Sequence, residues 1–185
     1  MGSVVLPPGV VIHTLTPHTD ARGTLTGDVP RELGLGCRPV QMNVVSSAAG
    51  VLRGVHVHAR HVDHICVAAG RMILGLHDIR PASPGSRTSC LIELDAGDPH
   101  AVVIPIGVAH GFYFPVPSTV VYAVSEYWRP EDELACRWDS PELGLAWPTR
   151  APTLCERAAA AGDYAAFVAM FRRARAEQTE RLGRD

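Results

Sequence analysis

The chain has 185 residues, of which 46% are hydrophobic and 19% are charged, and its formal net charge is −2. This length fits one folded domain with one hydrophobic core. The small net charge argues against a nucleic-acid partner, because a polyanion requires a strong basic field, and leaves a small anionic ligand as the expected partner. All 17 basic residues are arginines, so no chemical step can use a lysine as acid, base or Schiff base.

The N-terminal segment is apolar as far as Val11, but it contains Pro7 and Pro8 and lacks a basic start. It therefore predicts an ordered arm or edge strand rather than a signal peptide. No segment reaches the roughly 18 consecutive apolar residues that a membrane span requires. The five cysteines are dispersed without a CxxC spacing, at positions 37, 66, 90, 136 and 155. Such dispersed cysteines predict reduced core thiols and a cytoplasmic protein.

Short apolar runs broken by Gly, Pro, Asp and Ser extend from about residue 37 to 128. They recur about every 8–12 residues, which is typical of antiparallel sandwiches and barrels. The predicted strands are Val40–Val45, His64–Ala68, Met72–Leu76, Ser89–Leu94, Ala101–Ile104, Gly111–Phe114 and Val120–Val124. We expect a single mainly β domain over residues 1–185, with an N-terminal arm and edge strands over about 1–36 and a barrel over about 37–150.

The composition changes to Ala, Arg and Glu from Cys155 to about Arg181. Gly162-Asp163 interrupts this segment, so residues from about 151 to 185 predict a C-terminal helix or helix pair packed on the β body. Helical spacing places six residues on one face: Leu154, Ala158, Ala161, Ala165, Val168 and Phe171.

Histidines are concentrated in one stretch, with four within nine residues at positions 56, 58, 61 and 64, and another follows at position 110. His56 and His58 lie two residues apart, so on a strand both imidazoles leave the same face. Two imidazoles on one face indicate either half of a metal site or an acid/base pair in a pocket. The remaining histidines are expected to be ordinary surface or hydrogen-bonded residues: His13, His18, His61, His77 and His100.

Two stretches resemble the paired signatures of the cupin fold. The first is Gly50-x5-His56-x-His58-x4-Asp63-x6-Gly70, with Asp where Glu is usual, and the second is Pro105-x-Gly107-x2-His110. The resemblance implies a cupin or jelly-roll barrel (a double-stranded β-helix) with C-terminal helices, in which the two histidine strands face each other across the interior. A divalent Zn, Fe, Mn or Ni ion could then bind four of these ligands: His56, His58 and His110, with Asp63 or His64 as the fourth.

Most of the chain from Asp20 to Arg157 resembles the dTDP-4-dehydrorhamnose 3,5-epimerase family. The matching pieces, in chain order, are Asp20-x-Arg22-Gly23, Gln41-x-Asn43, Gly50-Val51-Leu52-Arg53-Gly54-Val55-His56, Asp78-Ile79-Arg80-x2-Ser83-Pro84, Ile104-Pro105-x-Gly107-x-Ala109-His110-Gly111-Phe112, Tyr127-x2-Pro130-x2-Glu133 and Trp138-Asp139-x-Pro141-x-Leu143-Gly144-x2-Trp147-Pro148. The resemblance implies an isomerase of deoxysugar biosynthesis and a homodimer whose subunits exchange their N-terminal segments.

The family's reaction removes a proton next to the C4 ketone of a nucleotide-linked sugar and returns a proton on the other face, without a cofactor. Such chemistry needs a base, an acid and donors that stabilise the enolate oxygen. The resemblance assigns the base to His56, with Arg53 beside it, and places His110 in the Ala-His-Gly-Phe element. The residues that match the nucleotide-binding set are Arg22, Gln41, Asn43 and Arg53.

Several catalytic partners of the family are replaced in this sequence. The lysine that stabilises the enolate aligns with His64, and the tyrosine acid aligns with Trp128, next to Tyr127. We count His64 and Trp128 among the substrate-binding positions. The carboxylate that orients the base aligns with Ala158.

A substitute for this carboxylate would have to come from elsewhere in the C-terminal segment. Glu156 and Asp163 are the acidic residues on either side of position 158. Either could orient the base if the helical segment is shifted.

The first hypothesis is an isomerase or epimerase for a nucleotide-linked 4-keto-6-deoxy sugar, such as a dTDP-hexose. His56 would be the base and His58 or Tyr127 the acid, with His110 as a further catalytic residue. A related alternative comes from Arg53-Gly54-x-His56-x-His58, which resembles the Arg-Gly-x-His-Ala-His run of the sugar-nucleotide 3,4-ketoisomerases.

The second hypothesis is a metal-dependent enzyme (an oxygenase, lyase or cyclase) that acts on another small biosynthetic substrate. A divalent metal would be its cofactor, whereas the epimerase hypothesis requires none. The third hypothesis is a non-catalytic binding protein on the same fold. In all three the expected partner is a small molecule, with no nucleic acid and no membrane.

Overall fold

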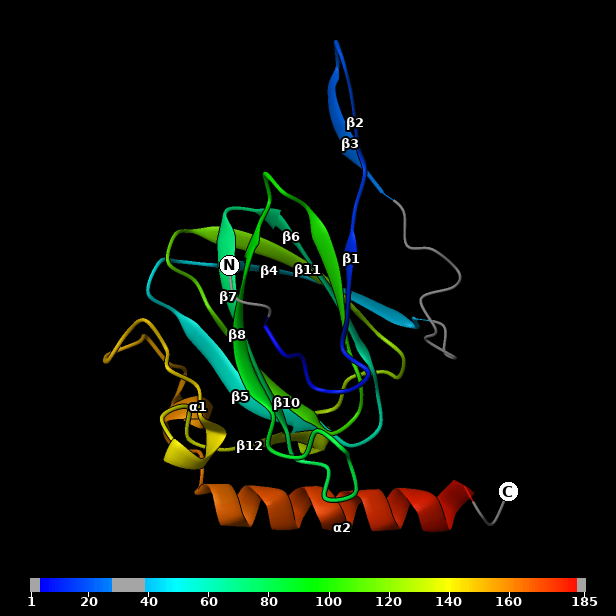
Figure 1. The fold of residues 1–185 in the computed structure, drawn as a ribbon, viewed down its shortest axis with the longest axis vertical. Coiled ribbons are helices and arrows are strands. Elements are labelled where there is room, and N and C mark those ends of the chain that lie inside the picture. Colours follow the sequence, from blue (N-terminus) through cyan, green and yellow to red (C-terminus); the bar gives the residue numbers. More distant parts are fainter. Residues whose placement is uncertain (1–3, 28–38, 183–185) are drawn as a thin grey trace.

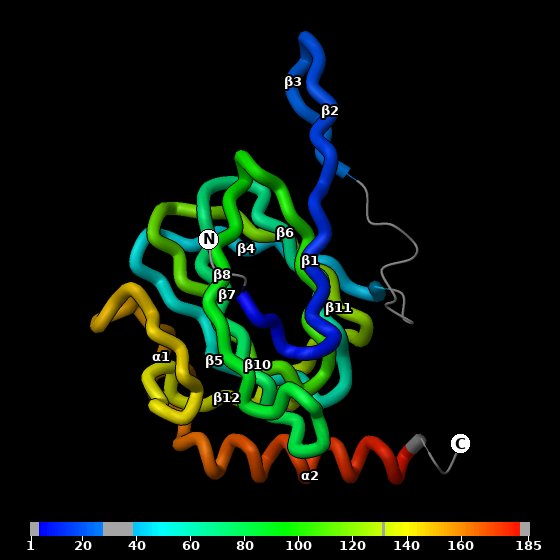
Figure 2. The backbone as a smooth tube through the Cα atoms, in the orientation of Figure 1, coloured from blue at the N-terminus to red at the C-terminus, as the bar shows by residue number. Residues whose placement is uncertain are grey.

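The computed structural model describes residues 4–27 and 39–182, so Cys37 and part of the predicted N-terminal arm lie outside the described residues. Two five-stranded antiparallel sheets face each other as the halves of a barrel (Figure 2). The first sheet contains, in spatial order, β1 (Val11–Thr14), β9 (His100–Ile104), β6 (Asp63–Ala69), β11 (Ser118–Val124) and β4 (Gln41–Ser47). The second contains β12 (Glu133–Ala135), β5 (Leu52–His58), β10 (Val108–Tyr113), β7 (Arg71–Asp78) and β8 (Ser89–Asp95).

The remaining elements lie outside the two sheets (Figure 1). The strands β2 (Pro17–Asp20) and β3 (Gly23–Thr26) form a separate hairpin that projects away from the barrel, and all their residues are exposed. The short helices η1 (Pro130–Asp132) and η2 (Pro141–Leu143) precede and follow β12. The helix α1 (Glu156–Ala159) contacts β5, and α2 (Tyr164–Leu182) contacts β12 along one end of the barrel.

The second sheet is covered on both of its faces. Its inner face joins the first sheet in one apolar cluster, which includes Leu74 and Leu76 of β7 and Ile65 of β6. On the outer face, Val55 and Val57 of β5 pack in a second cluster with these residues: Leu143, Trp147, Phe167 and Phe171. Each fully buried side chain of this size contributes roughly 1.5–3 kcal/mol, so the second sheet is firmly held.

The predicted fold class is confirmed, because the described chain consists mainly of facing antiparallel sheets with helices at its C-terminal end. All seven predicted strands are present within a few residues of their predicted bounds. The described chain has five further strands that are not among these seven: β1, β2, β3, β5 and β12. The edge strand predicted for the N-terminal segment is β1, which pairs with β9 from Val11 onward.

The predicted helix pair is also present, but its buried face is partly wrong. Ala165 is exposed, whereas Phe167 is fully buried. The residues of α2 that pack on the sheet are Tyr164, Phe167, Val168, Phe171 and Ala174. The aromatic residues set this face, since they have far more apolar surface to bury than the alanines.

No helix among residues 4–27 and 39–182 combines the length and apolar character needed to cross a membrane. The four described cysteines, Cys66, Cys90, Cys136 and Cys155, are free thiols.

Gly75 marks a close approach between β7 and the Trp147 indole on the outer face of the second sheet. A Cβ atom at residue 75 would lie 2.5 Å from Cη2 and 2.7 Å from Cζ2 of Trp147. The indole has a fixed position, because its Nε1 donates a hydrogen bond of 3.1 Å to the Trp138 carbonyl. Trp147 therefore packs on the sheet because residue 75 has no side chain.

Gly75→Ala is expected to lower the free energy of unfolding by about 1–3 kcal/mol, because the indole must move to make room. Urea denaturation of wild type and variant measures the difference. Gly27→Ala is the control, since a Cβ there would meet nothing within 4 Å and should change stability by less than about 0.5 kcal/mol. Equal midpoints for Gly75→Ala and wild type would contradict the close packing.

Candidate active site

A cavity of about 620 Å³ lies between the two sheets, which is the size of a site for a small molecule. The alternation of side chains along each strand determines which residues line the cavity, since every second residue points inward. On β11, for example, Val120, Tyr122 and Val124 all line the cavity. The polar lining residues include Gln41, Asn43, Arg53, His56, His58, His61, Asp63, His110, Tyr122, Trp128, Glu133, Thr153 and Arg157.

The two histidine strands are neighbours in one sheet, whereas the sequence analysis predicted that they face each other across the barrel. His56 of β5 pairs directly with His110 of β10. Their ring centroids lie 4.5 Å apart, and the His58 ring lies 5.0 Å from His56 and 5.2 Å from His110. The structure thus brings all three predicted catalytic imidazoles together, through hydrogen-bonded pairing of their strands.

Gly54 allows β5 and β10 to approach closely at this point. It has a φ of +98°, and a Cβ there would lie 2.7 Å from the His110 carbonyl oxygen and 3.2 Å from Nδ1 of His56. Any other residue would therefore be strained in its backbone and would displace the imidazoles.

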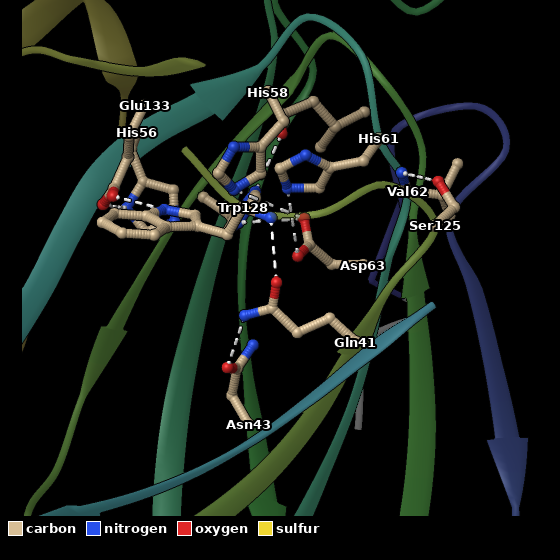
Figure 3. A network of polar contacts seen from close by, with 12 residues as sticks. Gln41, Asn43, His56, His58, His61, Val62, Asp63, Ser125, Trp128 and Glu133 are labelled. Atoms are coloured by element: carbon tan, nitrogen blue, oxygen red, sulfur yellow. Dashed lines mark hydrogen bonds and ion pairs between the residues drawn. The ribbon is translucent and has the colours of Figure 1, made fainter. Parts of the chain in front are cut away.

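Asp63, at the start of β6, lies close to three imidazoles, of which Figure 3 shows His58 and His61. Its Oδ2 atom is 3.5 Å from Nε2 of His58 and 3.6 Å from Nε2 of His110. Its Oδ1 atom is 3.8 Å from Nε2 of His61, whose ring stacks on His58 with centroids 3.9 Å apart. The first sheet therefore supplies a carboxylate to the imidazole cluster of the second.

The buried imidazoles are neutral. Burial, and after it the positive charge of Arg157, lower the pKa of His56 to about 3. Burial, followed by the neighbouring imidazoles, also holds the pKa values of His58 and His110 well below the usual 6.5. Nδ1 of His110 donates to the Val108 carbonyl at 3.0 Å, which leaves Nε2 as an acceptor toward Asp63. Such imidazoles can accept a proton or bind a cation.

Asp63 and Tyr122 of the cavity have raised pKa values. Burial, and then the charge of Glu133, raise the pKa of Asp63 well above 3.8. Burial, and then Asp63 and Glu133, also raise the pKa of the Tyr122 phenol. Tyr122 therefore keeps its proton and can donate it.

Four of the six predicted substrate-binding residues line the cavity: Gln41, Asn43, Arg53 and Trp128. The Gln41 side chain accepts a hydrogen bond of 3.0 Å from the Trp128 backbone and donates one of 2.9 Å to Asn43 (Figure 3). Nε of Arg53 donates to the Ser47 hydroxyl at 2.9 Å. These contacts fix the directions of the side chains on the cavity wall.

The other two predicted substrate-binding residues lie elsewhere. His64 alternates on β6 with the inward residues Asp63 and Ile65, so its imidazole points away from the cavity. The prediction of His64 as a substrate or metal ligand is therefore wrong, and Asp63 occupies the inward position. Arg22 lies in the turn of the projecting hairpin, where it pairs with Asp20 and has a side chain 90% exposed.

The prediction of Tyr127 as an acid is wrong for this cavity. It follows the end of β11, is 68% exposed and does not line the cavity. Tyr122 is the phenol on the wall. The alternation of Val120, Tyr122 and Val124 along a predicted strand was a signal for it that the sequence analysis did not use.

Two further residues of the site were missed. His61 was expected to be an ordinary surface or hydrogen-bonded histidine, yet it is 2% exposed and its Nε2 has no hydrogen-bond partner. Glu133 was noted only as part of a motif, yet its Oε1 lies 3.6 Å from Nδ1 of His56. No sequence pattern could reveal either, because a loop places His61 and the pairing of β12 with β5 places Glu133.

Two overlapping groups of the described residues offer donor atoms close enough for a metal ion. One group contains His56, His58 and His110, and the other contains His58, His61 and Asp63. Within each group all ligand atoms lie within 4.8 Å of one another. Four of the five predicted metal ligands are thus assembled, with His61 in place of His64.

Residues 6–166 match the family model for dTDP-4-dehydrorhamnose 3,5-epimerase. The chain belongs to this family. It is 32% identical over 187 positions to the dTDP-4-dehydrorhamnose 3,5-epimerase of Mycobacterium tuberculosis strain H37Rv, with 95% of this chain and 93% of the relative covered. The predicted isomerase class is confirmed with the family.

Solved structures agree with this assignment. The dTDP-6-deoxy-D-glucose-3,5-epimerase of Legionella pneumophila, in complex with dTDP-4-keto-L-rhamnose, superimposes with a TM-score of 0.76 at 29% identity, covering 84% of this chain and 87% of that one. The 3′-monoepimerase ChmJ of Streptomyces bikiniensis, in complex with dTDP-quinovose, gives 0.80 at 25% identity, covering 95% and 96%.

This member of the dTDP-4-dehydrorhamnose 3,5-epimerase family has no carboxylate at the position expected to orient the base. That position, Ala158, lies on α1 at the edge of the cavity. Glu156 is exposed, and Asp163 accepts a hydrogen bond from the Ala166 backbone at the start of α2. Glu133 is instead the carboxylate near His56.

Proposed function

We propose that the protein epimerises a nucleotide-linked 4-keto-6-deoxy sugar at a carbon next to the C4 ketone. The observation that carries this proposal is the placement of His56 and Tyr122 on opposite walls of one cavity. His56 belongs to β5 of the second sheet, and Tyr122 belongs to β11 of the first. A sugar ring between them would have a base on one face and an acid on the other, as inversion requires.

The proton transfers follow from these positions. Neutral His56 removes the proton next to the ketone, and the electron pair moves into the enolate. Tyr122 then delivers a proton to the opposite face of the same carbon. Arg53 places positive charge on the cavity wall, where it can stabilise the enolate oxygen or the diphosphate. These steps require no cofactor.

The direct test is solvent deuterium exchange, followed by NMR, at C3 and C5 of dTDP-4-keto-6-deoxyglucose. His56→Ala should abolish exchange, because the base is gone. Tyr122→Phe should retain exchange but lower formation of the epimer about 10²-fold, a typical contribution of a general acid. His100→Ala, which lies outside the cavity, is the control and should match wild type.

Two results would contradict parts of this proposal. Absence of exchange with any such sugar would reject the epimerase and favour a non-catalytic binding protein. A product with its ketone moved to C3 would favour 3,4-ketoisomerase chemistry with His56 and His58 as the acid/base pair.

We also propose a homodimer in which each hairpin reaches its partner. The β2–β3 hairpin leaves its own barrel and carries Arg22 at its turn (Figure 1). The edge strand β4 exposes Met42 and Val44, at 71% and 68%, on its outer face. A second copy of the chain would cover this apolar edge and bring an arginine to the anionic substrate. The four free thiols fit a reducing compartment such as the cytoplasm.

Subunit mixing tests this arrangement. Arg22→Ala and His56→Ala homodimers should each have low activity, because every site lacks one group. Random mixing should restore about a quarter of wild-type activity, since each heterodimer regains one complete site. No recovery, with heterodimers demonstrated by native mass spectrometry, would place Arg22 outside the partner's site.

A second candidate function is metal-dependent chemistry in the same cavity. Donor atoms of His58, His110 and His61 lie 3.5, 3.6 and 3.8 Å from the Asp63 carboxylate. Two ligands of a tetrahedral Zn²⁺ ion are separated by roughly 3.3–3.6 Å, given bonds of about 2.0–2.2 Å. The donor set therefore fits a divalent ion after small side-chain movements.

Elemental analysis of untagged protein tests this candidate independently of activity. Metal binding predicts near-stoichiometric Zn, Fe, Mn or Ni in wild type and its loss in His58→Ala, because His58 belongs to both donor groups. His100→Ala, outside both groups, should retain the metal. Wild type that stays metal-free after loading with all four ions would reject a metal site.

A further inference from the structure

A carboxylate from an unexpected element lies beside the Nδ1 atom of His56. Oε1 of Glu133 is 3.6 Å from Nδ1 of His56. Oε1 also contacts Nη2 of Arg157 at 2.6 Å, and Oε2 accepts a hydrogen bond of 2.9 Å from Nε1 of Trp128. Figure 3 shows the Trp128 indole beside both His56 and Glu133. Glu133 is therefore held at both oxygens next to the base.

Backbone pairing determines the position of this carboxylate. In the ladder between β12 and β5, Ala135 lies opposite His56 and Glu133 lies opposite His58. A side chain at position 133 can therefore lean along the strand to the His56 ring. Arg157 approaches from α1, which contacts β5. The three groups come from separate parts of the fold and meet at the cavity.

A carboxylate here would control the tautomer of His56. The side chains of His56 and Glu133 are only 11% and 13% exposed, so water weakens their interaction little. A neutral imidazole carries its proton on one nitrogen, and an adjacent carboxylate favours the proton on the nitrogen that it faces. Nδ1–H toward Glu133 leaves the lone pair of Nε2 as the base.

We propose that Glu133 is the positioning residue for His56, replacing the carboxylate that is absent at Ala158, and that Arg157 shares its Oε1 atom. This inference rests on the proposed function for its catalytic consequence. The shared oxygen explains a separation of 3.6 Å, which is longer than a hydrogen bond. An anionic substrate that engages the half-exposed Arg157 at the cavity would release Oε1, and Glu133 would then close on Nδ1.

The first test is ¹⁵N NMR of the His56 ring in the ligand-free, chelator-treated protein, which requires no activity. Wild type should show a protonated Nδ1 and an unprotonated Nε2. Glu133→Gln should lose this preference, because its amide does not favour the same tautomer. Arg157→Gln should keep it and move the Nδ1 proton downfield, since Glu133 is then free to approach His56. Glu156→Gln, the exposed carboxylate beside Arg157, is the matched control and should match wild type.

The second test is steady-state kinetics with a dTDP-4-keto-6-deoxy sugar. Glu133→Gln should lower kcat about 10- to 100-fold, the usual effect of removing a group that orients a functional histidine, with KM changed less than about twofold. Glu133→Asp should recover part of the loss. Arg157→Gln should raise KM more than it lowers kcat.

The outcomes separate orientation from a merely structural salt bridge. A structural role would lower the melting temperatures of Glu133→Gln and Arg157→Gln alike and leave the His56 tautomer unchanged, which would overturn the inference. An unchanged tautomer in a folded Glu133→Gln variant would also overturn it. If the tautomer depends on Glu133 but no sugar is turned over, the positioning role stands and the proposed epimerase function fails.

Discussion

The pairing of His56 with His110 in the β5–β10 ladder is the interaction on which the site depends. Hydrogen bonds between the two backbones bring their imidazoles to the same face, and Gly54 provides the space for this approach. Several polar groups of the cavity lie close to this pair. His58 follows two residues along β5, Glu133 belongs to the adjacent strand β12, and Asp63 belongs to β6 of the facing sheet.

The outer face of the second sheet keeps this arrangement rigid. Val55 and Val57 alternate with the inward histidines of β5 and pack beneath Phe167 and Phe171 of α2. The imidazoles therefore project from strands that are fixed by apolar packing behind them. A site built on regular strands can hold its groups with little freedom, which suits proton transfers that depend on precise placement.

Buried groups of opposite acid–base character share a single cavity. Burial keeps the imidazoles unprotonated and keeps a proton on the Tyr122 phenol. One wall therefore accepts protons and the other donates them, without a lysine anywhere in the chain. Each imidazole of the cavity has a carboxylate nearby. Asp63 lies close to His58, His61 and His110, and Glu133 lies beside His56.

The sequence by itself determined the fold class and seven of the strands, and it singled out His56, His58, Asp63 and His110, which the structure brings together at the cavity. Alternation and turn spacing are local properties, and motif residues that share a strand face can be recognised without coordinates. Only the tertiary structure showed that Tyr122 replaces Tyr127 on the wall, that His64 points outward and that His61 is buried. It also placed Glu133 beside His56, where the sequence suggested Glu156 or Asp163. These differences have one physical reason: contacts between distant segments depend on strand register and loop paths, which no local pattern encodes.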